Sequence, residues 1–214
     1  MAETEKRKVP STLKTILRYD AEITKRFVIW ANNILTFRTL RTHYRGLEIS
    51  CHGIPWFAFW IAFTWLFNNP HLVEMQVNIL LGLLLDIILV AVAKAYFRRK
   101  RPVQNKDDAL GQMGPDIFSF PSGHASRSIF VVYFFTRLYP LPILCYGPLI
   151  AWATSVSLSR VLMSRHYILD VLGGCLLGVF DGLLLELFWI SEETAKSLMS
   201  IVSDEKIDGG EYHV

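Results

Sequence analysis

After residue 46 the chain consists mainly of long apolar runs separated by short polar breaks. Five of these runs are candidate membrane-spanning helices, since about 20 apolar residues cross roughly 30 Å of hydrocarbon. They are residues 47–67, 72–97, 125–139, 141–157 and 168–190, of which the third is short. The last run is punctuated by Gly173, Gly174, Gly178 and Gly182, which suits close helix packing in lipid. The pattern predicts an all-α integral membrane bundle of about five spans.

The segment before the first apolar run has a different pattern. Between residues 11 and 35, apolar side chains alternate with basic ones at helical spacing. This is typical of an amphipathic helix on the bilayer surface, and equally of a helix packed against the rest of the protein. We therefore divide the chain into a basic N-terminal segment (1–46), a membrane-embedded domain (47–190) and an acidic, partly disordered tail (191–214).

Composition and charge narrow the class of protein. Hydrophobic residues make up 52% of the 214 residues, more than a soluble globule usually carries. The net charge is only +3, but ten of the 22 Lys and Arg residues precede residue 46 and six more lie within 94–106. The positive-inside rule then places both regions on the cytoplasmic side. Membrane lipids are the expected surroundings, and no nucleic-acid partner is expected.

A first polar cluster ends the second apolar run. Lys94 and Arg101 are seven residues apart, so they would share one helix face, and Pro102 helps to end the helix. An ammonium and a guanidinium group both suit phosphate oxygens. We interpret the neighbouring residues 98–100 as a basic flank of the membrane, with a role at a second phosphate only as a hypothesis.

A second cluster, Pro-Ser-Gly-His, directly precedes the third run. Ser122 is a candidate helix N-cap, and Gly123 would let the backbone approach a ligand closely. Free N–H groups at such a helix start can hold an anion. His124 could donate a proton to a leaving oxygen. Taken alone, the motif is more typical of an ordinary turn whose histidine caps the helix or bonds the backbone.

A third cluster precedes the last run. His166 and Asp170 have the i, i+4 spacing of one helix face, so the carboxylate could orient the imidazole for attack on phosphorus. Arg160 could complete a phosphate clamp, whereas Arg165 is interpreted as an interfacial anchor. The second and third clusters must meet, yet only 35 residues separate them. Two full crossings would not fit, so we expect a site below the membrane surface or a thinned bilayer.

A metal site is not expected. The cations of the clusters outnumber the carboxylates, and Asp107, Asp108 and Asp116 lack a spacing typical of Mg²⁺ or Zn²⁺ ligands. Asp86, Asp181 and Glu186 lie within the predicted spans, where we expect them to pair with other helices or with Lys and Arg. No cofactor is predicted.

Together the clusters match Lys-x6-Arg-Pro, Pro-Ser-Gly-His and Ser-Arg-x5-His-x3-Asp across residues 94–170. This signature resembles the type-2 phosphatidic acid phosphatase family, which shares its core with the soluble vanadium haloperoxidases; the hydropathy favours the phosphatase branch. The stretch Leu-Glu-Ile-Ser-Cys-His-Gly-Ile-Pro-Trp (47–56) is similar to polyisoprenoid diphosphate phosphatases, which act on presqualene and farnesyl-type diphosphates.

The resemblance implies roles for eight residues of this chain. His166 would be the nucleophile that forms a phosphohistidine, Asp170 would orient it and His124 would protonate the leaving group. The phosphate would be held by Lys94, Arg101, Ser122, Gly123 and Arg160, and no metal would take part. The chain has one clean span fewer before the first cluster than six-span members of the family.

The leading hypothesis is thus a metal-independent membrane phosphatase for polyisoprenoid diphosphates and monophosphates. An amphiphilic lipid phosphate is the expected substrate, and the endoplasmic reticulum or nuclear envelope, with the site facing the cytoplasm, the expected location. The alternatives are a phosphatase for phosphatidate or sphingoid-base phosphates, a catalytically inactive membrane scaffold, and an anion transporter.

Overall fold

The structure is a computed structural model that describes residues 10–34, 41–67, 69–103 and 117–202. Its long helices are α1 (Ser11–Asn32), α5 (Val73–Phe97), α7 (Tyr146–Leu162) and α8 (Ile168–Leu187). The shorter ones are η1 (Arg41–His43), α3 (Tyr44–Ser50), α4 (Gly53–Leu66), α6 (Gly123–Tyr133), η3 (Phe134–Leu138), η4 (Ile143–Cys145) and α9 (Glu192–Val202). Extended pairing within these ranges is limited to one isolated bridge between Lys100 and Phe118. The all-α prediction is confirmed.

Two helices of the described chain, α5 and α8, are long and apolar enough to span a membrane, and the bent pair α3–α4 would make a third. Both long helices leave large apolar side chains exposed on the outside of the bundle, among them Val92, Leu176 and Leu187. Such outward apolar faces match a hydrocarbon surrounding rather than water. The arrangement is that of an integral membrane bundle.

The first predicted span is broken rather than continuous. Helices α3 and α4 meet at a bend of 50° around Cys51 and His52. Pro55 has no N–H to donate to the carbonyl of Cys51, and that oxygen instead accepts a hydrogen bond from Nη1 of Arg127 at 3.0 Å. The Nδ1 atom of His52 accepts the N–H of Ile54 and caps the new helix. The polar sequence at this break thus restarts the helix in another direction.

The two middle helices are short for membrane spans. The continuous segment of α6 and η3 has 16 residues and α7 has 17, which correspond to about 24–26 Å of helix. They are shorter than the two long helices, and by length and composition two helices of the described chain, or three with the bent pair, qualify as candidate spans. Helix α7 also continues to Leu162, beyond the predicted end near residue 157, and carries Arg160 in its last turn.

The glycines of α8 allow α6 to pack against it at backbone distance. A Cβ atom on Gly174 would lie 2.4 Å from the carbonyl oxygen of Ser122, and one on Gly178 would lie 2.2 Å from that of Ser126. Gly173 and Gly182 face the rings of Phe120 and Tyr133 in the same way. The predicted role of these glycines in close packing is confirmed. The contact fixes the start of α6, which bears the second cluster, against the first turns of α8.

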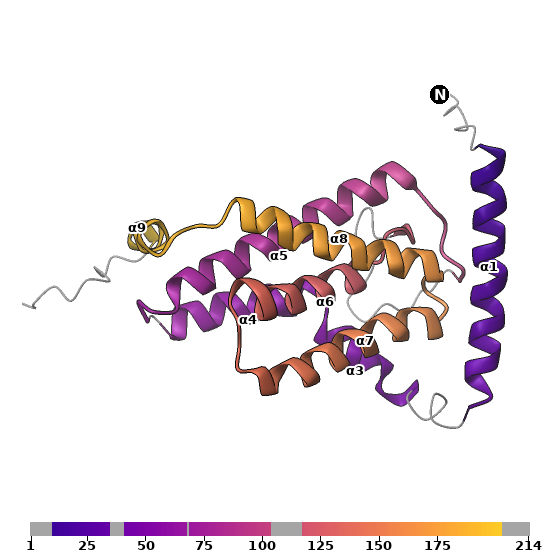
Figure 1. The fold of residues 1–214 in the computed structure, drawn as a ribbon, viewed down its shortest axis with the longest axis horizontal. Coiled ribbons are helices and arrows are strands. Elements are labelled where there is room, and N and C mark those ends of the chain that lie inside the picture. The colour runs from indigo at the N-terminus through magenta and orange to yellow at the C-terminus, as the bar shows by residue number, and fades with distance from the viewer. Residues whose placement is uncertain (1–9, 35–40, 68, 104–116, 203–214) are drawn as a thin grey trace, which may run out of the picture.

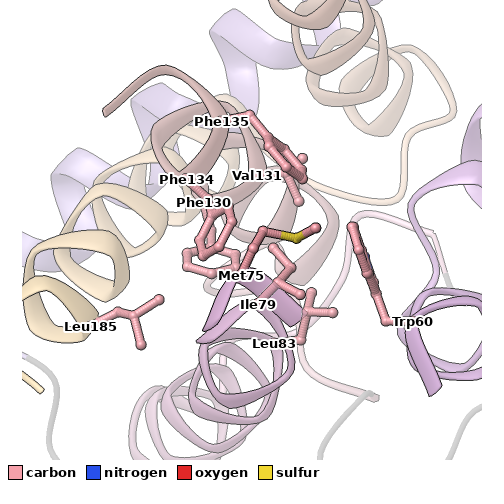
Figure 2. Packing of buried hydrophobic residues seen from close by; sticks show 9 residues of the cluster. All are labelled: Trp60, Met75, Ile79, Leu83, Phe130, Val131, Phe134, Phe135 and Leu185. Carbon is pink, nitrogen blue, oxygen red and sulfur yellow. The ribbon is translucent and has the colours of Figure 1, made fainter. Parts of the chain in front are cut away.

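The principal apolar core lies between α4, α5, α6, η3 and α8. Figure 2 shows the rings of Phe130 and Phe134 beside Met75 and Ile79, with Trp60 entering from α4 and Leu185 from α8. All of these side chains are at most 6% exposed. The core is displaced toward the end of the bundle that bears α9, so the polar clusters lie beyond it at the other end (Figure 1).

Helix α1 lies across one end of the bundle, transverse to the other helices (Figure 1). Its buried side chains include Asp20 and Thr24, and it contacts α7 and α8. Ile16, Tyr19, Ile23 and Trp30 form an exposed apolar stripe beside that buried edge. The helix therefore packs on the protein and also presents a face suited to a bilayer surface, so both sequence-based interpretations contribute.

At the opposite end of the bundle, the chain forms a helix where a partly disordered tail was predicted. Helix α9 covers Glu192–Val202, and residues 203–214 lie outside the described part of the chain. Ala195 is fully buried in this helix, which packs against α5. The preceding turn is tied to α5 by Asn78, whose side chain bonds both backbone groups of Ile190.

Candidate active site

The three polar clusters meet at the end of the bundle that α1 crosses. The end of α5, the start of α6, the end of α7 and the start of α8 all lie there (Figure 1). The ring of His166 lies in the electrostatic field of Lys94 and Arg101, and the ring of His124 in that of Arg160 and His166. Residues that are up to 72 positions apart along the chain thus lie in one group. The predicted assembly of the clusters agrees with this geometry.

Arg101 reaches the site by a route that differs from the predicted one. Helix α5 ends at Phe97, and Arg98 adopts a left-handed conformation with φ of 51° that reverses the chain. The next turn is held by Ser119, whose N–H donates to the carbonyl of Arg99 at 2.8 Å. Lys94 therefore lies on the helix, 3% exposed, whereas Arg101 lies on the following loop. The two cations do not share a helix face.

His166 also lies outside a helix. Helix α8 begins at Ile168, so His166 belongs to the turn after α7, and the prediction that it shares a helix face with Asp170 is wrong. Its Nδ1 atom lies 2.7 Å from the carbonyl oxygen of Ser119 and 3.8 Å from Oδ2 of Asp170. A carbonyl oxygen only accepts, so this contact requires the proton on Nδ1. The Nε2 atom then carries the lone pair.

Burial is the main cause that lowers the pKa of His166 to about 4; the charges of Arg101 and Lys94 add to the shift, and Asp170 opposes it. The ring should therefore remain neutral, and nucleophilic, throughout the physiological pH range. In the unfolded chain the ring would titrate near its ordinary value of about 6.5. The stabilisation from a neutral His166 is thus complete above that value and is lost as the pH falls from about 6.5 toward 4.

We expect a histidine-selective NMR titration in detergent micelles to show His166 protonating near pH 4. The variant His166→Asn, which lacks the imidazole, identifies the resonance by its loss. A midpoint at the ordinary value near 6.5 would contradict the buried geometry.

Asp170 is held by more partners than the sequence predicted. Its Oδ2 atom accepts the N–H of Tyr167 at 2.8 Å, which caps the first turn of α8. Its Oδ1 atom accepts from Nη1 of Arg99 at 2.7 Å, and its backbone carbonyl accepts the N–H of Ser122 at 2.9 Å. Arg99 is therefore a largely buried partner of the site rather than a basic flank of the membrane. The reversal of the chain at Arg98 turns the side chain of Arg99 inward.

His124 lies in the first turn of α6, two residues after Ser122, which caps the helix as predicted. The Oγ atom of Ser122 accepts the N–H of Ala125, and a Cβ on Gly123 would lie 3.3 Å from Val90, so helix packing also favours glycine here. The Nε2 atom of His124 donates to the carbonyl of Glu48 at 3.2 Å. Burial, followed by the charges of Arg160 and Arg127, lowers the pKa of His124 well below its usual range. A bound phosphate dianion would offset those cations and favour the protonated ring.

Arg160 is 1% exposed and is held by Glu48 of α3. Its Nη1 atom lies 3.5 Å from Oε1 of Glu48, and its Nη2 atom contacts Sδ of Met163 at 3.3 Å. The same carboxylate oxygen pairs with Arg165, which is 4% exposed. The interpretation of Arg165 as an interfacial anchor is therefore wrong, because Glu48 draws it into the protein. One carboxylate thus serves two buried guanidinium groups beside both histidines.

Sequence reasoning missed Glu48, Arg99 and Ser119. A lone acidic residue at the start of an apolar run was a usable signal for Glu48, because buried ionisable groups in membrane segments are rarely incidental. Arg99 stood within a basic run that resembles a membrane flank. Ser119 acts through its backbone carbonyl, and no side-chain pattern reveals that.

Two of the three acidic residues within the predicted spans pair between helices. Asp86 accepts from Oγ of Ser126 at 2.6 Å and pairs with Arg127 at 2.9 Å, and Glu186 accepts from the hydroxyl of Tyr133 at 2.8 Å. Asp181 is fully buried, and its carboxylate oxygens have no hydrogen-bond partner among the described residues, so the pairing expected for it is not found there. The described ranges contain no group of three or more His, Cys, Asp or Glu side chains placed to hold a metal ion; residues 107, 108 and 116 lie outside them.

These features define a class of protein: a helical membrane bundle that presents two imidazoles and several buried cations at one end. Comparison with known proteins agrees with this class. Residues 76–191 match the family model of the PAP2 superfamily. The chain is 36% identical over 152 residues to "Probable lipid phosphate phosphatase beta" of Arabidopsis thaliana, covering 59% of this chain and 71% of the relative.

A solved structure is similar over a longer stretch. The transmembrane PAP2 type phosphatidylglycerolphosphate phosphatase from Bacillus subtilis superposes with a TM-score of 0.57 at 25% identity, covering 81% of this chain and 86% of that one. The chain therefore belongs to the PAP2 superfamily. It is a phosphatase of that family, embedded in the membrane by its apolar helices.

Proposed function

We propose that this phosphatase hydrolyses polyisoprenoid diphosphates and monophosphates through a phosphohistidine on His166. The observation that carries the covalent mechanism is the fixed tautomer of that ring. With Nδ1–H bound to the carbonyl of Ser119, the lone pair on Nε2 is left to attack, beside Lys94 and Arg101. A neutral, oriented nucleophile next to buried cations is the arrangement that attack on a phosphoryl group requires.

The reaction then has two steps. Nε2 of His166 attacks the terminal phosphorus while Lys94, Arg101 and Arg160 neutralise the phosphoryl oxygens. Ser122 and Gly123 would also hold the phosphate. The bond from phosphorus to the leaving oxygen breaks, and His124 protonates that oxygen. Water next attacks the phosphohistidine, gives its proton to His124 and releases inorganic phosphate and neutral His166. Asp170 stabilises the positive ring of the intermediate at 3.8 Å.

The imidazole of His124 has one nitrogen available for this proton transfer. Its Nε2–H is engaged by the carbonyl of Glu48, so the transferred proton would reside on Nδ1. The protonated ring has donors on both nitrogens, which allows it to keep the contact with Glu48 while it serves the leaving oxygen.

The position of the site supports a lipid substrate. It lies at the end of helices whose outer faces are apolar, so a bound head group would leave its hydrocarbon tail in the bilayer. The isoprenoid preference rests on the similarity of residues 47–56 to polyisoprenoid diphosphate phosphatases. Glu48, from this segment, contacts Arg160 and, through its carbonyl, His124. The segment therefore contacts two of the residues that would bind the substrate's head group.

A second candidate is a broader lipid phosphate phosphatase that accepts phosphatidate or sphingoid-base phosphates. The printed name of the Arabidopsis relative, "Probable lipid phosphate phosphatase beta", favours it. The Bacillus structure, a phosphatidylglycerolphosphate phosphatase, also belongs to a protein with a glycerolipid substrate.

Phosphate release in detergent micelles separates these candidates. We expect kcat/KM for farnesyl or presqualene diphosphate to exceed that for phosphatidate and sphingosine phosphate at least tenfold, and EDTA to leave the rates unchanged. The reverse order would overturn the isoprenoid assignment in favour of the broader enzyme. Turnover by the parent that the His166→Asn variant lacks would exclude both an inactive scaffold and a transporter. Restoration of activity specifically by Mg²⁺ after EDTA treatment would overturn metal independence.

The positive charge at the site end also supports an orientation. The many Lys and Arg residues of α1 and of the loop after α5 lie at the same end as the histidines. We place this end on the cytoplasmic face, in the endoplasmic reticulum or nuclear envelope. In sealed microsomes, an impermeant thiol reagent should then label a cysteine substituted at exposed Arg18 and not the exposed Cys145 near the other end; labelling of Cys145 alone would reverse the orientation.

A further inference from the structure

Helix α1 contributes polar side chains to the first turn of α8. Oγ1 of Thr24 accepts the N–H of Ile168 at 3.1 Å, and Oδ1 of Asp20 accepts the N–H of Leu169 at 3.1 Å. Asp20 and Thr24 are 6% and 4% exposed although they belong to an otherwise basic surface helix. Two N–H groups that the start of α8 would leave unsatisfied are thus bound by a segment almost 150 residues away.

Arg99 connects this helix to the site. Its Nη2 atom lies 2.6 Å from Oδ2 of Asp20, and its Nη1 atom lies 2.7 Å from Oδ1 of Asp170. The guanidinium carbon lies 4.0 Å from the centre of the Tyr167 ring, and the side chain is 11% exposed. The planar fork therefore joins α1, the loop after α5 and the start of α8 in one fixed arrangement.

The remaining oxygen of Asp170 faces the nucleophile. Oδ2 accepts the N–H of Tyr167 and lies 3.8 Å from Nδ1 of His166, so Arg99 and Tyr167 together set the direction of the carboxylate. Neither Asp20 nor Arg99 has to touch a phosphate to influence the reaction. A shift of Asp170 away from the ring would remove its negative charge from the positive phosphohistidine.

We infer that Asp20 and Arg99 are positioning residues, through which the surface helix α1 holds Asp170 in place for catalysis by His166. The inference rests on the proposed phosphohistidine mechanism and extends it to a helix that lies outside residues 76–191, the part matched by the family model. Because the two residues act on the carboxylate and not on the substrate, their loss should lower kcat and leave phosphate binding unchanged.

The test uses the full-length protein in micelles with the substrate that the parent turns over best. We expect Arg99→Gln to lower kcat about 10–100-fold, the scale seen when an outer partner of a catalytic or ligating group is removed. Asp20→Asn should lower kcat less, and it should have no further effect in the Arg99→Gln background, since both act along one path. KM and the inhibition constant of inorganic phosphate should stay within about twofold.

Controls separate this role from others. Glu22→Gln and Arg26→Gln remove an exposed ion pair from the same helix and should leave kcat unchanged. Arg99→Lys keeps the charge but not the fork, and should recover only part of kcat. Independent losses in the double variant, or a tenfold weaker inhibition by phosphate with kcat intact, would overturn the inference. The parent and His166→Asn are assayed alongside, so failure of the phosphohistidine mechanism would appear there as His166-independent turnover.

Discussion

Replacement of His166 by asparagine is expected to lower turnover by at least about 10⁴-fold, the order of loss seen when a covalent nucleophile is removed. The amide nitrogen of asparagine can still donate to the carbonyl of Ser119, which accepts from Nδ1 at 2.7 Å in the parent. The variant should therefore fold while it lacks the lone pair on Nε2. The measurement is phosphate release from a lipid phosphate, together with trapping of a ³²P-labelled, acid-labile and base-stable phosphoenzyme.

His124→Asn provides the matched comparison, because it removes the proposed acid and keeps the nucleophile. Its loss should be smaller, about 10²–10⁴-fold, and should shrink further with a substrate whose leaving group needs no proton. A phosphoenzyme should still form from such a substrate. If His166→Asn retained turnover within tenfold of the parent, the covalent mechanism would be untenable.

The second large effect is expected at Glu48, whose carboxylate pairs with Arg160 and Arg165 in the interior. Glu48→Gln keeps the shape of the side chain and leaves two guanidinium groups, 1% and 4% exposed, without their anion. Breaking a buried pair in this way typically costs about 3–5 kcal/mol. We therefore expect a loss of that size in the free energy of unfolding in detergent, and a weaker affinity for inorganic phosphate because Arg160 is no longer held.

Glu22→Gln is the control for this variant, since Glu22 pairs with Arg26 on the exposed side of α1. Its removal should change the free energy of unfolding by less than about 0.5 kcal/mol. A second comparison combines Glu48→Gln with Arg165→Met, which removes one of the stranded charges and should recover part of the lost stability. A loss below about 1 kcal/mol for Glu48→Gln alone would show that water reaches these guanidinium groups and that the pair is not buried.

These contacts share one feature. The predicted catalytic groups are held by residues that are not among the specified positions of the three motifs. Glu48 holds Arg160 and His124, Ser119 holds His166, and Arg99 with Asp20 holds Asp170. Glu48 and Asp20 lie on α3 and α1, whereas Arg99 and Ser119 lie on the loop between α5 and α6. Preorganisation of a phosphoryl site thus depends partly on α1 and α3, which lie far from the motifs in sequence.

The sequence by itself determined the class of fold, the long helices α5 and α8, the close packing along the glycines of α8 and the three clusters of reactive side chains. Those features follow from hydrophobic run length, small residues and reactive side chains, all of which are local properties of the chain. Only the tertiary structure decided which side chains bind and orient the catalytic and phosphate-binding residues. Three features depend on a partner from a distant segment: the break between α3 and α4, the reversal at Arg98 and the inward turn of Arg165. As a result, residues of a basic run become buried counter-ions instead of a membrane flank. Local pattern cannot contain that information, because the free energy of a buried charge is set by the oppositely charged group that folding brings to it.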